Sequence, residues 1–122
     1  TNFINTVEQA AQMADEIGHP NINIMLDCKA ISSMAGGPIE MIRRFGKRAR
    51  HFHANEAGGK GVGMPVGENE PAPLDFKAII KALIQSGYKG WISVEPFDYN
   101  PDPTTVAQAA IKVLKDALAS AT

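Results

Sequence analysis

Apolar residues recur at helical spacing in four segments of this chain and alternate with polar residues in three others. The helical segments are 7–17, 38–45, 76–86 and 103–117, and the alternating segments are 22–27, 50–56 and 91–95. Helices and strands therefore succeed each other along the chain, which predicts an α/β fold. Strands separated by helices pair in parallel through right-handed crossovers, so all three strands should end at the same edge of one sheet.

The segment boundaries carry local signals of their own. Thr6 and Gln9 have the spacing of a capping box, and Pro38 suits a first helical turn. Residues 29–37 have no such pattern and are expected to form a loop. Residues 57–73 are rich in glycine and proline, and they are too long for a simple connector, so they are predicted to be a functional loop.

Each predicted strand ends in a residue that can bind a metal or move a proton. Asp27, His53 and Glu95 close the three strands, each on the face opposite the apolar one. Because the carboxyl ends of parallel strands meet at one edge, these three side chains are expected to converge. Two carboxylates and an imidazole suit Mn²⁺, Co²⁺, Zn²⁺ or Mg²⁺ and leave coordination positions open for a substrate.

A structural role is the competing explanation for these residues. A single Asp or His at a strand end is more often a capping or hydrogen-bonded residue than a ligand. Burying three ionisable groups together is costly unless something binds them, and this favours a divalent-metal site. Cys28 is the only cysteine, so multi-cysteine zinc motifs are excluded, and its thiol is expected to pack rather than to act as a nucleophile.

Composition limits the possible partners. The 122 residues suffice for one domain, and a formal net charge of −1 gives no global attraction to nucleic acid or to an anionic membrane. No apolar run approaches a membrane span and no leader-like segment opens the chain, so the cytoplasm is the expected location. A basic cluster near a helix end is expected to be a solvated face rather than a nucleic-acid site; its members are Arg43, Arg44, Lys47, Arg48 and Arg50.

Four motifs resemble one enzyme family. They are Thr-Asn-Phe-Ile-Asn-Thr (1–6), Leu-Asp-Cys-Lys-Ala (26–30), His-Phe-His-Ala-Asn-Glu (51–56) and Gly-Tyr-Lys-Gly-Trp-Ile-Ser-Val-Glu (87–95). They look like the sugar phosphate isomerase/epimerase family, the xylose-isomerase-like barrels, which also resemble DNA-repair endonucleases that hold several zinc ions. The resemblance implies the C-terminal half of a (β/α)8 TIM barrel, with three strands and four helices over residues 1–122.

The resemblance also implies a site and a reaction. In that family Glu, Asp, His and Glu at the ends of strands five to eight hold a divalent metal, and Asp27, His53 and Glu95 match the last three. The implied reaction is isomerisation or epimerisation of a sugar or sugar phosphate through a metal-stabilised enediolate, with Glu95 as a catalytic carboxylate. The family's first Glu would precede Thr1, which leaves one of the two acid/base positions without a residue here.

Four residues are candidates for substrate binding. The chain has Lys29-Ala30 where the commoner family pattern places a His three residues after the Asp, so Lys29 is expected to take over a contact to the substrate. The family's loop after the His often carries a basic residue, and Lys60 is the candidate for it. Asn55 and Glu56 lie beside the predicted site, although hydrogen bonds to the glycine-rich loop would also explain them.

Two other functions stay open at this point. One is a non-catalytic half-barrel whose chemistry went with the missing strand. The other is endonuclease-like DNA repair, which needs further His and Asp ligands, and residues 61–73 contain neither. Three strands leave two sheet edges uncovered, so the chain is expected to be a fragment, as its start at Thr1 suggests, or to form a homo-oligomer or pair with a complementing half-barrel.

Overall fold

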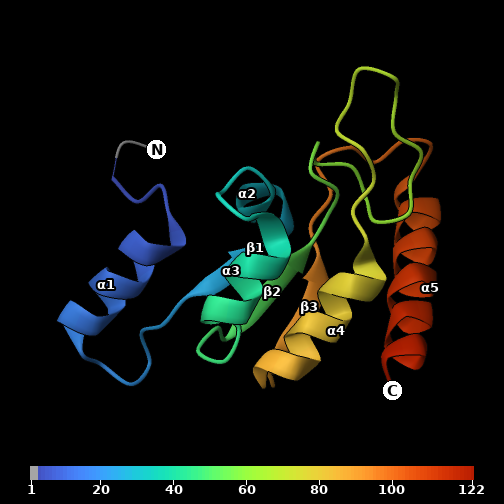
Figure 1. Cartoon of the computed structure of the whole chain (residues 1–122). Coiled ribbons are helices and arrows are strands. Elements are labelled where there is room, and N and C mark those ends of the chain that lie inside the picture. Colours follow the sequence, from blue (N-terminus) through green and yellow to red (C-terminus); the bar gives the residue numbers. More distant parts are fainter. Residues whose placement is uncertain (1–2) are drawn as a thin grey trace.

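A computed structural model describes residues 3–122, so Thr1 and Asn2, which open the first family-like motif, lie outside the described residues. Five helices and three strands follow one another along the chain (Figure 1). In order they are α1 (Val7–Ile17), β1 (Met25–Asp27), α2 (Cys28–Ser32), α3 (Gly37–Phe45), β2 (His51–Ala54), α4 (Phe76–Ser86), β3 (Trp91–Val94) and α5 (Pro103–Ala121). The predicted α/β alternation is confirmed.

The three strands form one parallel sheet in the order β1-β2-β3. Their register places Asp27, His53 and Ser93 side by side in one row across the sheet. Side chains alternate between the faces of a strand, so these three share a face. The sheet therefore brings the ends of its strands together, as parallel pairing requires.

The opposite face of the sheet holds the core. Leu26, Phe52 and Ala54 are completely buried there, and α3 and α4 cover this face (Figure 1). The helices contribute the apolar stripe that their sequence spacing predicts, so sheet and helices share one cluster. Its other large buried members are Ile31, Met41, Ile42, Phe76, Ile79, Ile80 and Leu83.

The count of four helices was wrong by one, because residues expected as a loop contain α2. Asp27 caps this short helix: its Oδ1 accepts a hydrogen bond from the backbone N–H of Ala30 at 3.1 Å. Burial of Cys28 and Ile31 then fixes the turn against the core. Five residues are too few to show helical periodicity, which is why the pattern did not reveal the element.

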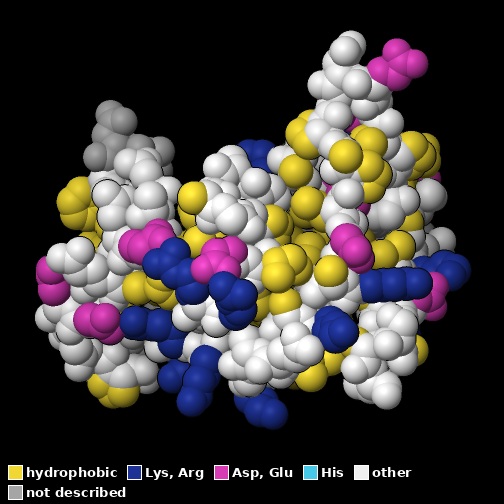
Figure 2. All heavy atoms as spheres, in the orientation of Figure 1, with side chains coloured by type: hydrophobic (Ala, Val, Ile, Leu, Met, Phe, Trp, Pro, Cys, Tyr) yellow, Lys and Arg dark blue, Asp and Glu magenta, His cyan; other side chains and the backbone are white. Residues whose placement is uncertain are grey.

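The basic cluster ties α1 to α3. Arg44 of α3 binds Glu8 of α1 at 2.6 Å, and Arg48, three residues after α3, binds Asp15 of α1 at 2.7 Å. Figure 2 accordingly shows Lys and Arg side chains interleaved with Asp and Glu on this face. Arg44 and Arg48 therefore have carboxylate partners within the described chain.

The sheet is open on its inner face and at its β3 edge. Trp91, on the inner face, is 83% exposed, and Ile111 and Leu118 of α5 are each about half exposed beside the β3 edge. The long loop between β2 and α4 rises above the C-terminal ends of the strands (Figure 1). Among the described residues, none of the helices is both long and apolar enough to cross a membrane.

Candidate metal centre

Asp27, His53 and Glu95 meet at the C-terminal edge of the sheet, as the sequence predicts. His53 Nδ1 lies 2.8 Å from Glu95 Oε2 and 3.3 Å from Asp27 Oδ2. One ligand atom from each residue falls within 4.8 Å of the others, and within the described chain this is the group of such residues that could hold a metal ion. Three separate βα units thus supply one constellation.

Local structure explains why these side chains point toward one another. Asp27 and His53 are register partners, so their side chains rise from adjacent positions on the same face. Glu95 follows the last paired residues of β3 and stays aligned through its backbone N–H, which donates to Ala54 O at 3.4 Å. Asp27 is held a second time, because its Oδ1 caps α2 and leaves Oδ2 facing His53.

The donor set fits a divalent metal. Carboxylate oxygens and imidazole nitrogens bind such ions at roughly 2.0–2.2 Å, so ligands of one ion lie about 3 Å apart. The separations of 2.8 and 3.3 Å around His53 match that spacing. Two carboxylates and one imidazole would leave further coordination positions for oxygens of a substrate, as in catalytic rather than structural sites.

His51 and Ser93 form a second polar pair next to the triad, to which the sequence pattern assigned no role. His51 lies two residues before His53 on the same strand face, and Ser93 is the register partner of His53. His51 Nε2 is 2.6 Å from Ser93 Oγ, and the His51 ring stands edge-on to the His53 ring at a centroid distance of 5.2 Å. The signal was available in the alternation of β2, which places both histidines on one face. His51 therefore supports the orientation of His53 from beneath.

Asn55 and Glu56 are fully or almost fully buried and are bonded to the backbone. Asn55 Oδ1 accepts the N–H of Lys29 at 2.9 Å, and Asn55 Nδ2 donates to Glu95 O at 3.2 Å. The Glu56 carboxylate accepts N–H groups of Gly63 and Leu74, at 3.4 and 2.8 Å. These contacts fix the loops around the triad, whereas substrate contact by either residue stays a prediction.

The two candidate lysines lie in different settings. The ammonium of Lys29 stands 5.3 Å from the centre of the Phe97 ring. Lys60 instead binds Glu70 at 3.2 Å and donates to Pro65 O at 3.2 Å, within the long loop. Both side chains follow strand ends that carry a member of the triad, and substrate binding by either one remains a prediction.

Cys28 packs, as expected. Its side chain is completely buried, and burial raises the pKa of the thiol to about 12. A thiol that stays protonated at physiological pH is a poor nucleophile and a poor metal ligand. Cys28 therefore contributes to the core next to Asp27 and is not part of the candidate metal site.

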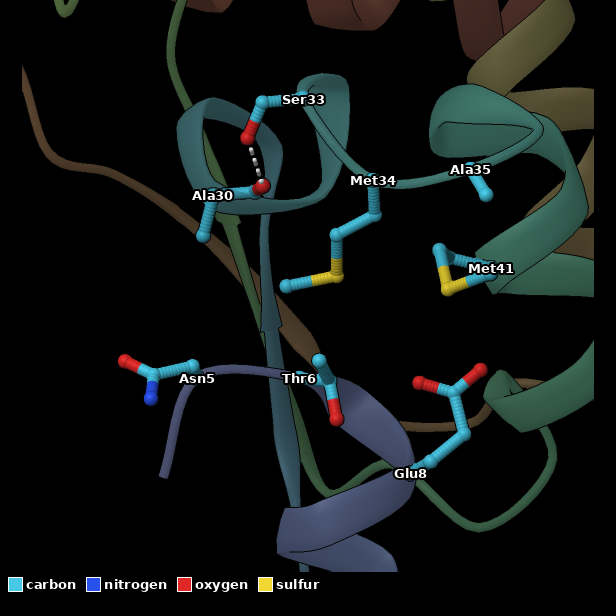
Figure 3. A pocket seen from close by; sticks show the side chains of 8 residues that line it. All are labelled: Asn5, Thr6, Glu8, Ala30, Ser33, Met34, Ala35 and Met41. Carbon is cyan, nitrogen blue, oxygen red and sulfur yellow. Dashed lines mark hydrogen bonds between the residues drawn. The ribbon is translucent and has the colours of Figure 1, made fainter. Parts of the chain in front are cut away.

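One hollow of the surface lies away from the triad. It has a volume of about 480 Å³ and lies between the start of α1 and the α2–α3 segment, where Met34 and Met41 project into it (Figure 3). Glu8 is its only charged residue and is already bound to Arg44. Because no member of the triad lines this hollow, it is not the site of the metal chemistry.

A parallel βα sheet with a candidate metal site at its C-terminal edge is the arrangement of βα barrels, which place their active sites at that edge. The family model described as "Xylose isomerase-like TIM barrel" matches residues 1–117. The chain belongs to this family of barrels, which confirms the expected family and fold class.

Curated relatives are similar over most of this chain. A human "Putative hydroxypyruvate isomerase" is 29% identical over 104 residues, covering 85% of this chain and 35% of that protein. The D-psicose 3-epimerase of Enterocloster bolteae is 32% identical over 99 residues, covering 78% of this chain and 29% of that protein. The chain thus spans about a third of the length of these relatives.

Solved structures share the fold. An L-ribulose 3-epimerase superposes with a TM-score of 0.83 at 22% identity, covering 99% of this chain and 44% of that chain. The IolI protein, solved with a bound zinc atom, gives a TM-score of 0.68 at 24% identity and covers 98% and 45%. The described sheet and helices therefore correspond to less than half of a complete barrel.

Proposed function

We propose that this chain provides the metal-binding half of a sugar or sugar phosphate isomerase/epimerase. The convergence of Asp27, His53 and Glu95 at the C-terminal edge of the sheet carries this proposal. Its relatives include enzymes named as isomerases and epimerases of small hydroxycarbonyl compounds, and a zinc-bound structure has the same fold. All three residues would hold a divalent ion.

The site's own residues suit proton transfer. A divalent ion there would act as a Lewis acid that polarises a carbonyl and its neighbouring hydroxyl. Glu95 is the candidate base: its Oε2 faces His53, which leaves Oε1 to take a proton from the carbon next to the carbonyl. Its side chain is 48% exposed, so a substrate can reach it from the open face.

One carboxylate limits the chemistry that these residues can complete. Isomerisation can use a single base, because the proton is removed from one carbon and returned to its neighbour on the same side. Epimerisation at one carbon returns the proton to the opposite face and so needs a second acid there. Within the described residues, Glu95 is the only carboxylate of the triad free for this work, since Asp27 also caps α2.

The open edges of the sheet bear on activity. Parallel sheets are normally covered on both faces, and the inner face and the β3 edge are not covered here. We propose that the remaining strands of an eight-stranded barrel cover them and supply the second acid. Two copies of this sheet would give only six strands, so assembly as a homo-oligomer is the less complete solution; sedimentation of the purified chain would detect it as a mass above 13.1 kDa.

Calorimetric titration of the metal-free chain with Mn²⁺ tests the site directly. We expect one ion per chain, with binding lost in His53→Ala and Glu95→Gln. His19→Ala and Glu16→Gln are matched controls, because both residues are exposed and lie outside the triad. Undiminished Mn²⁺ binding in the two triad variants would contradict the proposal.

Activity needs its own measurement. Incorporation of solvent deuterium at the carbon next to a ketose carbonyl, followed by proton NMR, reports proton abstraction without requiring a complete reaction. We expect exchange that depends on both Mn²⁺ and Glu95. Mn²⁺ binding without any exchange would favour the alternative, a metal-binding half-barrel that is not catalytic alone.

A further inference from the structure

We propose that Lys29 binds an anionic group of the substrate, a carboxylate or a phosphate, so that the chain acts on acidic hydroxycarbonyl compounds rather than on neutral sugars. This inference rests on the proposed function, because it places the anion beside the triad that would hold the metal. It names a class of substrate that the family assignment leaves open.

The position of Lys29 follows from contacts between the three segments that come directly after β1, β2 and β3. Its ammonium stands over the ring of Phe97, and a Cβ built on Gly59 would lie 3.5 Å from the carbons of its stem. These three residues follow Asp27, Glu95 and His53 by two, two and six positions. The cluster of Lys29, Gly59 and Phe97 is thus assembled from the segments that follow the three strands whose ends carry the triad.

Gly59 makes this approach possible. Its φ of +88° is a conformation that L side chains rarely adopt, and an added Cβ would come within 3.0 Å of the Phe97 ring. Its carbonyl accepts the N–H of Phe97 at 2.7 Å. The loop after β2 therefore packs directly onto the residues that flank Lys29.

The backbone of Lys29 is tied to that of a triad member. Asn55, completely buried, accepts the N–H of Lys29 and donates to the carbonyl of Glu95. A single amide side chain therefore fixes the start of the Lys29 side chain relative to Glu95. An anchor for one end of a substrate needs this kind of fixed distance from the reacting end.

Within the described chain, Lys29 contacts the Phe97 ring but forms no ion pair. No carboxylate among residues 3–122 forms an ion pair with it, in contrast to Lys60, which binds Glu70. Two acidic residues at the ends of β1 and β2 have other partners: Asp27 faces His53 and caps α2, and both Glu56 oxygens accept backbone N–H groups. An exposed ammonium without a carboxylate partner, on the segment that follows Asp27, is suited to an anionic ligand.

The test compares three linear four-carbon probes on the Mn²⁺-loaded chain: erythritol, erythronate and erythritol 4-phosphate. Calorimetry gives the dissociation constant of each. We expect at least one of the anionic probes to bind about tenfold more tightly than neutral erythritol, the gain typical of one charge-assisted hydrogen bond. Comparing erythronate with erythritol 4-phosphate tells a carboxylate site from a phosphate site.

Substitutions decide whether Lys29 causes that preference. Lys29→Gln should remove it while leaving the affinity for erythritol and Mn²⁺ unchanged, and Lys29→Arg should retain it. Lys89→Gln is the matched control, because Lys89 is an exposed lysine that precedes β3 at the opposite edge of the sheet. An anionic preference that persists in Lys29→Gln would arise from the metal alone and would overturn the inference.

Two negative results are distinguishable. If the wild-type chain binds Mn²⁺ but shows no preference for either anionic probe, the Lys29 anchor is wrong and the metal site stands. If the wild-type chain does not bind Mn²⁺, the proposed function itself fails and the anchor fails with it.

Discussion

The two faces of this sheet differ strongly in how far their side chains are exposed to solvent. On the outer face, Leu26 and Phe52 are completely buried under the helices, whereas on the inner face Trp91 is 83% exposed and the triad is partly open. Neighbouring residues of one strand thus serve opposite purposes. The outer face holds the core, and the inner face carries the candidate metal site and is open among the described residues.

The difference shows how βα barrels separate stability from function. Strand alternation sends each successive side chain to the other face, so a change at one position need not disturb the next. The polar inner face contributes little to the core, so substitutions on this face should leave the chain folded. This separation leads to predictions for residues that are neighbours in sequence or in register.

The largest contrast is expected between Phe52 and Trp91, two large aromatic residues on opposite faces. Phe52→Ala should lower the free energy of unfolding by about 3–5 kcal/mol, because it leaves a cavity in the core. Trp91→Ala should change it by no more than about 0.5 kcal/mol. Urea denaturation of both variants measures the difference, and a large loss in Trp91→Ala would mean that the inner face is covered in solution.

The triad should contribute to stability only through the metal. Mn²⁺ at about 100 times its dissociation constant should stabilise the wild-type chain by about 2.7 kcal/mol, since only the folded state assembles the ligands. His53→Ala should abolish that gain, while the metal-free stability should change by less than about 1 kcal/mol because the site is partly exposed. Thermal unfolding with and without Mn²⁺ measures both quantities. Equal stabilisation of the two proteins would contradict this division of roles.

Asn55 should contribute both to the stability of the fold and to the metal site. Asn55→Ala removes two buried hydrogen bonds, to the backbones of Lys29 and Glu95, which should lower the unfolding free energy by about 2 kcal/mol. Because Asn55 also aligns Glu95, the Mn²⁺ affinity should fall by up to about tenfold. Asn100→Ala is the control, since Asn100 is exposed and bonds locally to Asp98. A loss of stability with unchanged metal affinity would leave Asn55 a purely structural role.

The sequence predicted those features that depend on short periodicities. Alternation around His53 predicted the strand and its faces, and parallel topology then predicted that Asp27, His53 and Glu95 converge. The prediction succeeded because all parallel strands end at one edge, so topology alone brings distant residues together. No knowledge of individual side-chain contacts was needed.

Features that depend on tertiary contacts could not be predicted in the same way. The short helix α2 depends on a cap from Asp27 and on burial of Ile31, and neither produces a periodic signal in five residues. Lys29 contacts Phe97, which lies 68 positions further along the chain, and only the folded chain shows this contact. The different contacts of Lys29 and Lys60 could not be predicted from the sequence either, because both are basic residues just beyond a strand end.

The smallest effect at neutral pH is expected for Cys28, the residue that follows Asp27 but packs in the core. Burial raises the pKa of its thiol from 9.0 to about 12, so the folded state keeps the proton that the unfolded chain loses. The contribution of this thiol to stability is therefore constant below about pH 9 and should decrease by about 1 kcal/mol per pH unit between pH 9 and about 12. Cys28→Ala should lack this decrease.

The same burial should make the thiol unreactive toward a thiol reagent such as iodoacetamide at pH 8 unless urea is added, which mass spectrometry can follow. Rapid labelling of the native chain would show that the core around Cys28, next to Asp27, opens readily. The two faces of the sheet would then not be independent, because the metal ligand and the core would move together.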